Sequence, residues 1–511
     1  MDNQNELSEV WRLYERAQRY TNKIGLSQTI KNNVNFYEGR QWAPASELTK
    51  SMPRPVVNLV KFICRNKRAM LTSTPVRLVY KSMIDSDRAN EYTSFANYVC
   101  KEMEMDEIDS TAIRDAVLKG SYFYHLFWDS EKTSSRGIKE GGLRCEIIDP
   151  QNIYFSNPED GFEQRQEWII IASTLPINTL KAIADTDVDR DLITPDNNDE
   201  IEDYATVLTR YFRRNGEVFC EKAVRKTIIN KAFKITPENV TDYKATMYPV
   251  VAGCYEEREK SIYGISEAEG LINDQKLVNH ILGMEALAIQ NIAWGKYIVS
   301  KDALRGQQIS NEPGEILIDH SINGNGIRKL EQHSLSAMPL NYVNTLTSMI
   351  RTVSGATEVI TGETLIGNMS GRAIAQLQDQ ANQPILDQRK RFWRTKERFG
   401  KLLAQCFKLY YERKVYYDKS EEKVFISSNY DGLEFEVSVE AIGGASGSIA
   451  GDINLLETLY QKGDISAETF VEAYPGDMIL NKQKILDILS KQNQSVLESE
   501  RQAKPNSDTN D

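Results

Sequence analysis

The amino-acid sequence predicts an α+β fold, and three observations support this prediction. Between residues 76 and 251, short runs rich in β-branched and aromatic residues alternate with polar loops, which is typical of strands. Two later segments, 266–292 and 338–354, carry apolar residues at the spacing of one helical face. A third helical pattern covers residues 372–413. Strands and helices segregated in this way indicate the α+β class.

The composition is that of an ordinary soluble protein. The 511 residues, 41% of them hydrophobic, can bury a sizeable core and are expected to form more than one lobe. No apolar run reaches roughly 18 residues and the first residues are charged, so we expect no membrane span, no signal peptide and a cytoplasmic location. The net charge of -11 argues against a protein that reads DNA sequence, which usually carries a basic surface. The six cysteines lack metal-binding spacing and are expected to be reduced and buried.

The N-terminal part is predicted to contain helices followed by strands. Residues 1–50 have a polar helical pattern. Pro53 and Pro55 prevent a helix before Val56, and apolar residues at helical spacing then predict a helix up to Pro75, basic on its other face. The strand-like runs that follow are VRLVY, SYFYHLFW, LRCEIID, EWIIIAS, ATVLTRYF and GEVFCEKAV.

Two long helices with a β insertion between them are predicted next. Ser266 is a good N-cap for the first helix, with Glu269 three residues later. This helix has four acidic residues against one lysine, a net charge of -3, so we expect an acidic surface. The strand candidates KYIVSK, EILIDHS and IRKLEQ follow, with a hairpin signal at Asn323 to Gly326. The second helix begins near Met338 and ends at Gly355.

The remaining chain is predicted to hold a long loop, a kinked helix and a helical end. Residues 356–371 contain three glycines and no Lys or Arg, and a loop of about 15 residues is long for a compact domain. Pro384 should kink the helix that follows. After the strand-like runs KVYYDK, EKVFISS and LEFEVSVE, we expect a flexible stretch at 443–451. About three short helices, broken at Gly463 and Pro475, and a polar disordered tail complete the chain.

The sequence contains no nucleotide-binding motif that we can identify. A P-loop needs GxxxxGK[ST], but the glycines at Gly362 and Gly367 are followed by Asn368 and Met369. The glycines near Gly443 precede no βαβ unit and are expected to form a linker. We therefore expect no catalytic residue, no cofactor and no enzymatic activity.

Two other features resemble metal or catalytic sites only in part. Asp185, Asp187 and Asp189 begin like a calcium loop, but Arg190 stands where the loop needs glycine. We favour a solvated acidic loop, and predict no metal site. His125, within FYHLFW, is expected to be a packed strand residue rather than a base or a ligand.

The most basic stretch is DQRKRFWRTKERFGK, from Asp387 to Lys401, with a net charge of +5. One interpretation is contact with phosphates, with the aromatic residues stacking on bases. The other is a helix whose aromatic side chains enter the core and whose cations pair with acidic groups of the protein. We favour the second, because Phe392 and Phe399 are seven residues apart and share a helical face.

The order of these segments, together with four local strings, resembles the portal proteins of tailed bacteriophages. The strings are YEGRQW, RPVVNLVKFICRNKRAMLTSTP, IDPQNIYFSNP and SGRAIAQLQDQANQPI. The resemblance covers nearly the whole chain. It implies a ring of roughly twelve subunits with cyclic symmetry around a DNA channel at one capsid vertex.

The resemblance also implies a division of the chain into regions that are named here and kept below. It implies a wing at 1–262, a first stem helix at 263–292, a clip at 293–337, a second stem helix at 338–355, a tunnel loop at 356–371, a kinked long helix with wing strands at 372–442, a linker and helical crown at 443–500, and a disordered tail at 501–511.

Candidate functional residues follow from these regions. The tunnel loop would place near DNA the residues Thr357, Glu358, Val359, Thr361, Thr364, Leu365, Ile366 and Asn368. The stem would line the channel with Glu267, Asp274, Glu285 and Arg351. The clip would contact the packaging motor and the connector through Lys301, Arg305, Asn323, Asn325 and Arg328. An acidic wall would repel the phosphate backbone and keep a moving duplex from sticking.

The partners that the resemblance implies are further copies of the chain and double-stranded DNA that passes without sequence specificity. It also implies the large terminase subunit, a head-to-tail adaptor, and the major capsid and scaffold proteins, with no membrane and no cofactor. The protein would be assembled in the host cytoplasm and located in the virion. Two alternatives stay open: a minor head or adaptor protein without a channel, which would be a stable monomer, and a nucleic-acid enzyme such as a nuclease or the motor.

The loop at 356–371 gives a first prediction. Because it has no cation, it would touch DNA by shape and lower the friction of translocation. Deletion of Gly362 to Gly367 should impair packaging or retention of DNA. Ring assembly, measured by negative-stain microscopy, should be unchanged, and a loss of rings would contradict this role for the loop.

Overall fold

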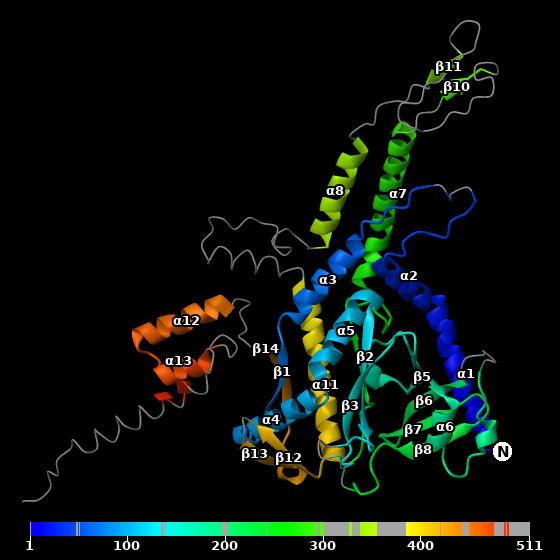
Figure 1. The fold of residues 1–511 in the computed structure, drawn as a ribbon. Helices are drawn as coiled ribbons and strands as arrows, with labels where there is room; N and C mark the ends of the chain where they lie inside the picture. The colour runs from blue at the N-terminus through cyan, green and yellow to red at the C-terminus, as the bar shows by residue number, and fades with distance from the viewer. Residues whose placement is uncertain are drawn as a thin grey trace, which may run out of the picture.

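The computed structural model describes residues 2–47, 50, 52–133, 137, 139–196, 203–241, 243–293, 297–300, 326–329, 338–354, 385–418, 421–441, 449–474, 485–486 and 488–489. Helices and strands are both abundant, which confirms the α+β class. A body of β-sheets and several helices carries a pair of helices that project from it (Figure 1). No helix in the described ranges combines the length and the apolar character needed to cross a bilayer.

The N-terminal helices begin and end where local signals place them. Helix α1 covers Asp2–Lys23 and α2 covers Leu26–Glu38, separated by Gly25 in the left-handed conformation with φ 67°. Helix α3, Leu59–Thr72, starts three residues later than predicted. The reason is Asn58, whose side chain accepts a hydrogen bond from the Lys61 backbone and so acts as the N-cap.

Two helices lie where the sequence analysis expected mainly strands. Helix α4 covers Ser86–Glu102 and α5 covers Met105–Lys119. Asp85 caps α4 by accepting from the Arg88 backbone. The buried face of α4 is built from alanines and from Tyr92, Phe95 and Val99, and such aromatic and β-branched residues also favour strands. The periodicity was therefore ambiguous, and only packing decides it.

All six predicted strand runs of this region are strands. The five-stranded antiparallel sheet has the order β4-β5-β6-β7-β8, and the three-stranded sheet has the order β3-β2-β9. The strands are β2 (Ser121–Asp129), β3 (Gly142–Ile148), β4 (Ile153–Phe155), β5 (Trp168–Pro176), β6 (Tyr204–Arg214), β7 (Glu217–Ala223), β8 (Ile228–Lys234) and β9 (Val250–Cys254). Short helices α6 (Ile177–Ile183), η1 (Glu163–Arg165) and η2 (Arg190–Leu192) lie between them.

The first strand pairs far along the chain. Strand β1 (Val76–Lys81) is antiparallel to β14 (Glu436–Ala441), with Val76 opposite Ala441. The hairpin of β12 (Arg413–Asp418) and β13 (Glu421–Ile426) and the short helix η4 (Ser427–Tyr430) precede β14. The three C-terminal strand runs are thereby confirmed, and they belong to the same body as the N-terminal half.

Helix α11, Leu386–Tyr410, lies at the centre of the body. Phe399 is fully buried and lies 5.3 Å from the ring of Tyr124 on β2. On another side the Tyr80 hydroxyl donates to the Gly400 carbonyl at 2.8 Å. A Cβ at Gly400 would meet Val437 at 2.6 Å, so only glycine lets β14 approach this closely.

The projecting pair consists of α7 (Glu267–Ala293) and α8 (Met338–Val353), as predicted. The backbone of Glu269 donates to the Ser266 hydroxyl at 3.0 Å, which confirms the N-cap. Beyond the far end of α7, β10 (Tyr297–Val299) pairs with β11 (Ile327–Lys329), and Figure 1 shows both at the tip. The rest of the clip at 293–337 lies outside the described residues, and so do the tunnel loop at 356–371 and Pro384.

The described C-terminal part contains α12 (Ile449–Lys462) and α13 (Ala467–Ala473), separated at Gly463 as predicted. Their contact is the stacked pair Tyr460 and Phe470, with ring centres 4.8 Å apart. Gly451, predicted as part of a flexible linker, lies within α12. The expected break at Pro475 and the tail at 501–511 lie outside the described residues.

Lys396 gives a test of how α11 is held. Its ammonium group, 3% exposed, lies 2.9 Å from Asp109 of α5, which also accepts from the Tyr124 hydroxyl at 2.6 Å. Burial alone would lower the pKa of Lys396, but Asp109 outweighs this and raises it. Lys396→Met should destabilise the fold by about 1–3 kcal/mol in urea unfolding, because the half-buried carboxylate of Asp109 loses its cation and keeps the hydrogen bond from Tyr124.

The double variant Lys396→Met with Asp109→Asn separates the ion pair from simple packing. Its loss of stability should be clearly smaller than the sum of the two single losses. Arg19→Ala, at an exposed position of α1, should change stability by less than about 0.5 kcal/mol. Additive losses at Lys396 and Asp109 would contradict the coupling.

Candidate channel and assembly site

The two projecting helices pack against each other and against α3 near their base. The buried residues of this contact are Val278 and Ile281 of α7, Val343 and Ile350 of α8, and Leu59 and Ile63 of α3. These residues recur at helical spacing on each element. The pair is therefore anchored on its lower, α3 side and extends away from the body above it (Figure 1).

A buried amide network fixes α7 to the start of α3. Gln275 is 1% exposed, and its Oε1 accepts from the Leu59 backbone at 2.8 Å. Its Nε2 donates to the Val57 carbonyl at 2.8 Å and to Asn279 Oδ1 at 3.0 Å. The Asn279 amide in turn donates to Gln41 at 2.6 Å. Because each amide is satisfied, the network sets both position and rotation of α7.

The segment between α2 and α3 braces the other side of α7. The Trp42 ring stands edge-on to His280 with ring centres 5.1 Å apart, and its Nε1 donates to the Pro55 carbonyl at 3.0 Å. A cavity of about 370 Å³ remains between this segment and α7, and Met284 is part of its wall.

Large apolar side chains remain exposed on one side of the helix pair. On α7, Leu277 is 41% and Met284 is 64% exposed; on α8, Tyr342 is 52%, Met349 is 58% and Val353 is 89% exposed. Contiguous apolar surface of this kind usually marks an interaction site. We call these five residues the apolar stripe.

Helix geometry places the whole stripe on the same side of the pair. Leu277 directly precedes Val278, and Tyr342 and Met349 directly precede Val343 and Ile350, which face the helix contact. One residue is a turn of about 100°. Helix α7 leaves the body and α8 returns to it, so the two helices are antiparallel. In such a pair, the residue that directly precedes a contact residue projects to the same side of the pair in both helices.

The predicted channel-lining residues do not form one exposed row. Asp274 is exposed, but Glu285 is only 7% exposed. Glu267 is half-buried, burial raises its pKa, and it accepts a hydrogen bond from Tyr255 at 2.7 Å. Neither Glu267 nor Glu285 is exposed on the open surface of the single subunit, and their place on a channel wall stays a prediction. Their positions on α7 coincide with the side that faces the body and α8, because 267 and 285 are five full turns apart.

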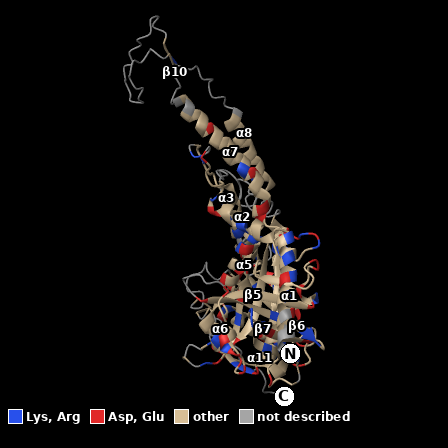
Figure 2. Ribbon diagram, turned by 90° about the vertical axis from the view of Figure 1, so that its right-hand side faces the viewer, with Lys and Arg blue, Asp and Glu red and all other residues tan. Residues whose placement is uncertain are grey.

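Helix α8 has almost no charge. Its single ionisable cation, Arg351, is half-buried with its guanidinium 5.3 Å from the Phe62 ring centre. The side that carries no large apolar residue is uncharged and exposed, and it consists of Asn341, Asn344, Thr345, Ser348 and Thr352. Figure 2 shows the pair mostly free of charged residues, whereas blue and red are dense on the body. The sequence analysis missed both surfaces, although the breadth of apolar spacing from Tyr342 to Val353 could have signalled the first.

The other predicted site residues are placed only in part. Arg328 of the clip lies exposed on β11. Outside the described residues lie Lys301, Arg305, Asn323 and Asn325, and also the tunnel-loop residues Thr357, Glu358, Val359, Thr361, Thr364, Leu365, Ile366 and Asn368. The described residues therefore include both projecting helices, but not the predicted tunnel loop and not most of the predicted clip.

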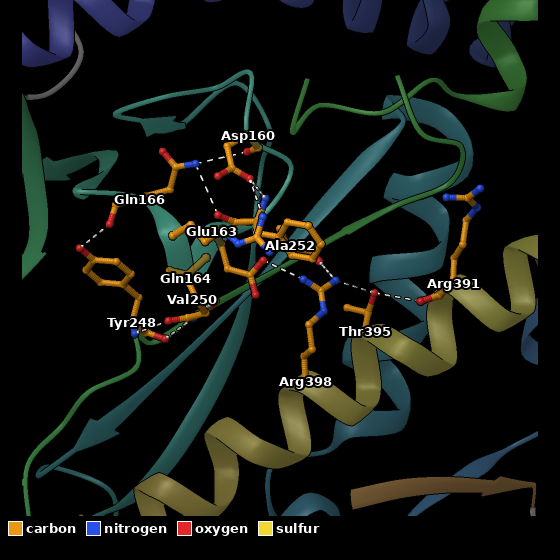
Figure 3. Close-up of polar contacts among 12 residues, drawn as sticks. Asp160, Glu163, Gln164, Gln166, Tyr248, Val250, Ala252, Arg391, Thr395 and Arg398 are labelled. Carbon is orange, nitrogen blue, oxygen red and sulfur yellow. Dashed lines mark hydrogen bonds and ion pairs between the residues drawn. The ribbon is translucent and has the colours of Figure 1, made fainter. Parts of the chain in front are cut away.

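The basic stretch at 387–401 is mainly part of the body, as favoured from the sequence. Phe392 is 8% and Phe399 is 0% exposed. Figure 3 shows Arg398 reaching from α11 to Glu163, with N–H donation at 2.7 Å, and to the Ala252 carbonyl at 2.6 Å. Glu163 is 1% exposed, and burial raises its pKa even though Arg398 opposes this.

The features that partly resembled catalytic or metal sites have structural roles. His125 is buried on β2, with Nδ1 2.8 Å from Glu146 and Nε2 2.9 Å from the Tyr211 hydroxyl. Asp185 accepts from the Asn230 amide at 2.8 Å, and Asp187 pairs with Lys231. Across the described ranges, no three His, Cys, Asp or Glu side chains are grouped to hold a metal ion.

The cysteines are free thiols in buried or half-buried positions, as expected. Burial raises the pKa of the Cys220 and Cys406 thiols to about 12. At neutral pH they stay protonated and act as small apolar side chains.

No protein-family model matches the chain, and no curated protein matches it.

Substitution of Gln275 tests how α7 is attached to the start of α3. Gln275→Leu should cost about 2–4 kcal/mol in stability, because the Leu59 N–H and the Asn279 amide lose buried partners. Hydrogen exchange at residues 57–60 should rise. Asn273→Ala, an exposed position two residues earlier, is the matched control. Unchanged exchange at 57–60 would show that the network does not hold α7 to α3.

Proposed function

We propose that this chain is the portal subunit of a tailed bacteriophage. Many copies, roughly twelve, form a ring with cyclic symmetry at one capsid vertex. The ring is the channel through which double-stranded DNA is packaged and ejected. It docks the terminase motor and the head-to-tail adaptor and meets the capsid and scaffold proteins. It acts in the virion without a cofactor and without catalysis of its own.

The observation that carries this proposal is the apolar stripe on the projecting pair. An isolated helix pair would not keep Met284, Met349 and Val353 in water, since each exposed side chain of this size costs about 1.5–3 kcal/mol relative to burial. The five residues of the stripe share one side of the pair, although Ile289, Ile292 and Leu340 are exposed elsewhere on the same helices. A one-sided surface of this kind suits a heterologous contact, in which each subunit covers its neighbour and the repeat closes into a ring.

The charge distribution of α8 supports a conduit for DNA. The side with Asn341, Thr345, Ser348 and Thr352 offers hydroxyl and amide groups but no cation. Tight DNA binding is dominated by Lys and Arg contacts with phosphates. An uncharged wall holds the duplex weakly, which is what translocation requires. This surface takes the place of the acidic wall that the sequence suggested.

The proposed ring can be tested through the stripe. Met284→Glu with Met349→Glu should lower the assembled fraction at least about tenfold, because buried unpaired carboxylates destabilise an interface. Mass photometry of the purified protein measures this directly. Thermal stability of the monomer should change little, since both side chains are exposed.

The matched control adds the same charge elsewhere. Gln28→Glu with Asn32→Glu, both exposed on α2, should leave assembly unchanged. A wild-type protein that stays monomeric at every concentration would overturn the proposed function and favour a structural protein without a channel.

A further inference from the structure

One part of the basic stretch is not used inside the body. Lys390, Arg394 and Lys401 are exposed, whereas Arg391, Lys396 and Arg398 pair with carboxylates of this chain. We call the three exposed cations the basic row. Within the described part of the chain, none of them forms an ion pair. Two acidic residues of α11 lie beside them, the half-buried Glu397 and the exposed Asp387, which pairs with Arg391.

The basic row points away from the body and from α5. Its spacings of four and seven residues put the three cations on one side of α11. Lys396, which reaches Asp109 of α5, projects about 140° from this side around the helix. Gly400, in contact with Val437 of β14, and Arg398, in contact with Glu163, occupy the two flanks. The row therefore faces outward as a ridge of about 16 Å.

An acidic surface lies beyond α5. Glu104, Asp106 and Glu107 are exposed at the start of α5, and we call them the acidic corner. Glu107 is two residues before Asp109, so it projects from the opposite side of α5, away from α11. Asp106, three residues before Asp109, lies only about 60° around the helix from it and does not share this outward side. Glu107 and the basic row thus point in opposite directions from the α5 and α11 pair.

The acidic corner borders a groove of about 550 Å³ between α5 and the edge strand β3. The two cations in the groove wall are already neutralised. Lys132 lies 3.2 Å from Glu102, and Arg144 lies 2.7 Å from Asp129. Besides Glu102, the acidic side chains in the wall of this groove are Glu104 and Glu107. The groove consequently has an excess of negative charge that no described cation of this chain balances.

We propose that the basic row of α11 in one copy docks against the acidic corner and groove of the next copy. This inference rests on the proposed ring and adds the contact between neighbouring bodies. The surfaces suit each other in charge, and one is a ridge while the other is a groove. They lie on opposite sides of the subunit, which a head-to-tail contact in a closed ring requires.

The charges set the register of the contact more than its strength. Exposed ion pairs contribute little individually, but like charges placed opposite each other strongly disfavour an interface. The apolar stripe supplies affinity, and the row and corner orient the bodies. Asp106 and Glu107 also favour the start of α5, so the test must measure assembly rather than stability.

The experiment is a charge exchange in the full-length protein. The first variant carries Arg394→Glu and Lys401→Glu, the second carries Glu104→Lys and Glu107→Lys, and the third carries all four changes. Arg19→Glu with Lys31→Glu, both exposed and far from α11, is the matched control for the first. Mass photometry at low and high ionic strength gives the assembled fraction, and circular dichroism checks folding.

The expected result is specific to pairing. Each two-residue reversal should raise the concentration needed for assembly about tenfold or more at low ionic strength, and less at high ionic strength. The third variant should regain assembly. An equal mixture of the first and second variants should also assemble, because each offers the charge that the other needs, and the control should assemble like the wild type.

Four outcomes overturn the inference in distinguishable ways. Wild-type-like assembly of the first or second variant shows that these surfaces do not meet, while the proposed ring stands. Loss without rescue in the third variant or the mixture excludes pairing of row and corner. Intact rings with weaker binding of a short DNA duplex by the first variant make the row a nucleic-acid contact. A monomeric wild type removes the inference together with the proposed function.

Discussion

The structure depends on how α11 is held inside the body. An apolar helix could occupy this position in several rotations, but Lys396 has one carboxylate to reach, Asp109 of α5, and Arg398 has another, Glu163. Buried ion pairs add little net stability, yet an unpaired buried charge is costly, so alternative packings are penalised. The two pairs thereby fix α5 and the two sheets relative to one helix. Every outward feature, including the basic row, inherits its direction from this arrangement.

The helix pair is held by different interactions from those that hold α11 in the body. Its base is specified by amides, with Gln275 satisfied on both its oxygen and its nitrogen, and one side along its length is left with apolar side chains in water. The base therefore determines the direction of the helix pair, and the stripe leaves apolar surface that a contact with another molecule would bury. In the proposed ring the same pair would serve both purposes, with the neighbour covering the stripe and the uncharged side of α8 left for DNA.

The sequence predicted much of the fold because the decisive signals were local. Ser266 as an N-cap, the apolar spacing of α7 and α8, and the runs of aromatic and β-branched residues in β2 and β6 all act over a few residues. Helices α4 and α5 were missed because the aromatic and β-branched residues on their buried faces also favour strands. The candidate site was predicted less well. Whether Glu285 is exposed depends on the facing helix, and net charge along a helix does not reveal which side each carboxylate occupies.

The pairing of β1 with β14 has a consequence for how the chain is made. Arg77 and Glu440 stay 3.2 Å apart although 363 residues separate them. During translation, the whole stem emerges before the strand that closes the body exists. Contacts between such distant segments form late and slowly. The nascent chain therefore carries an unclosed body for most of its synthesis, and in the proposed ring the productive meeting of copies would be postponed until the polypeptide is nearly complete.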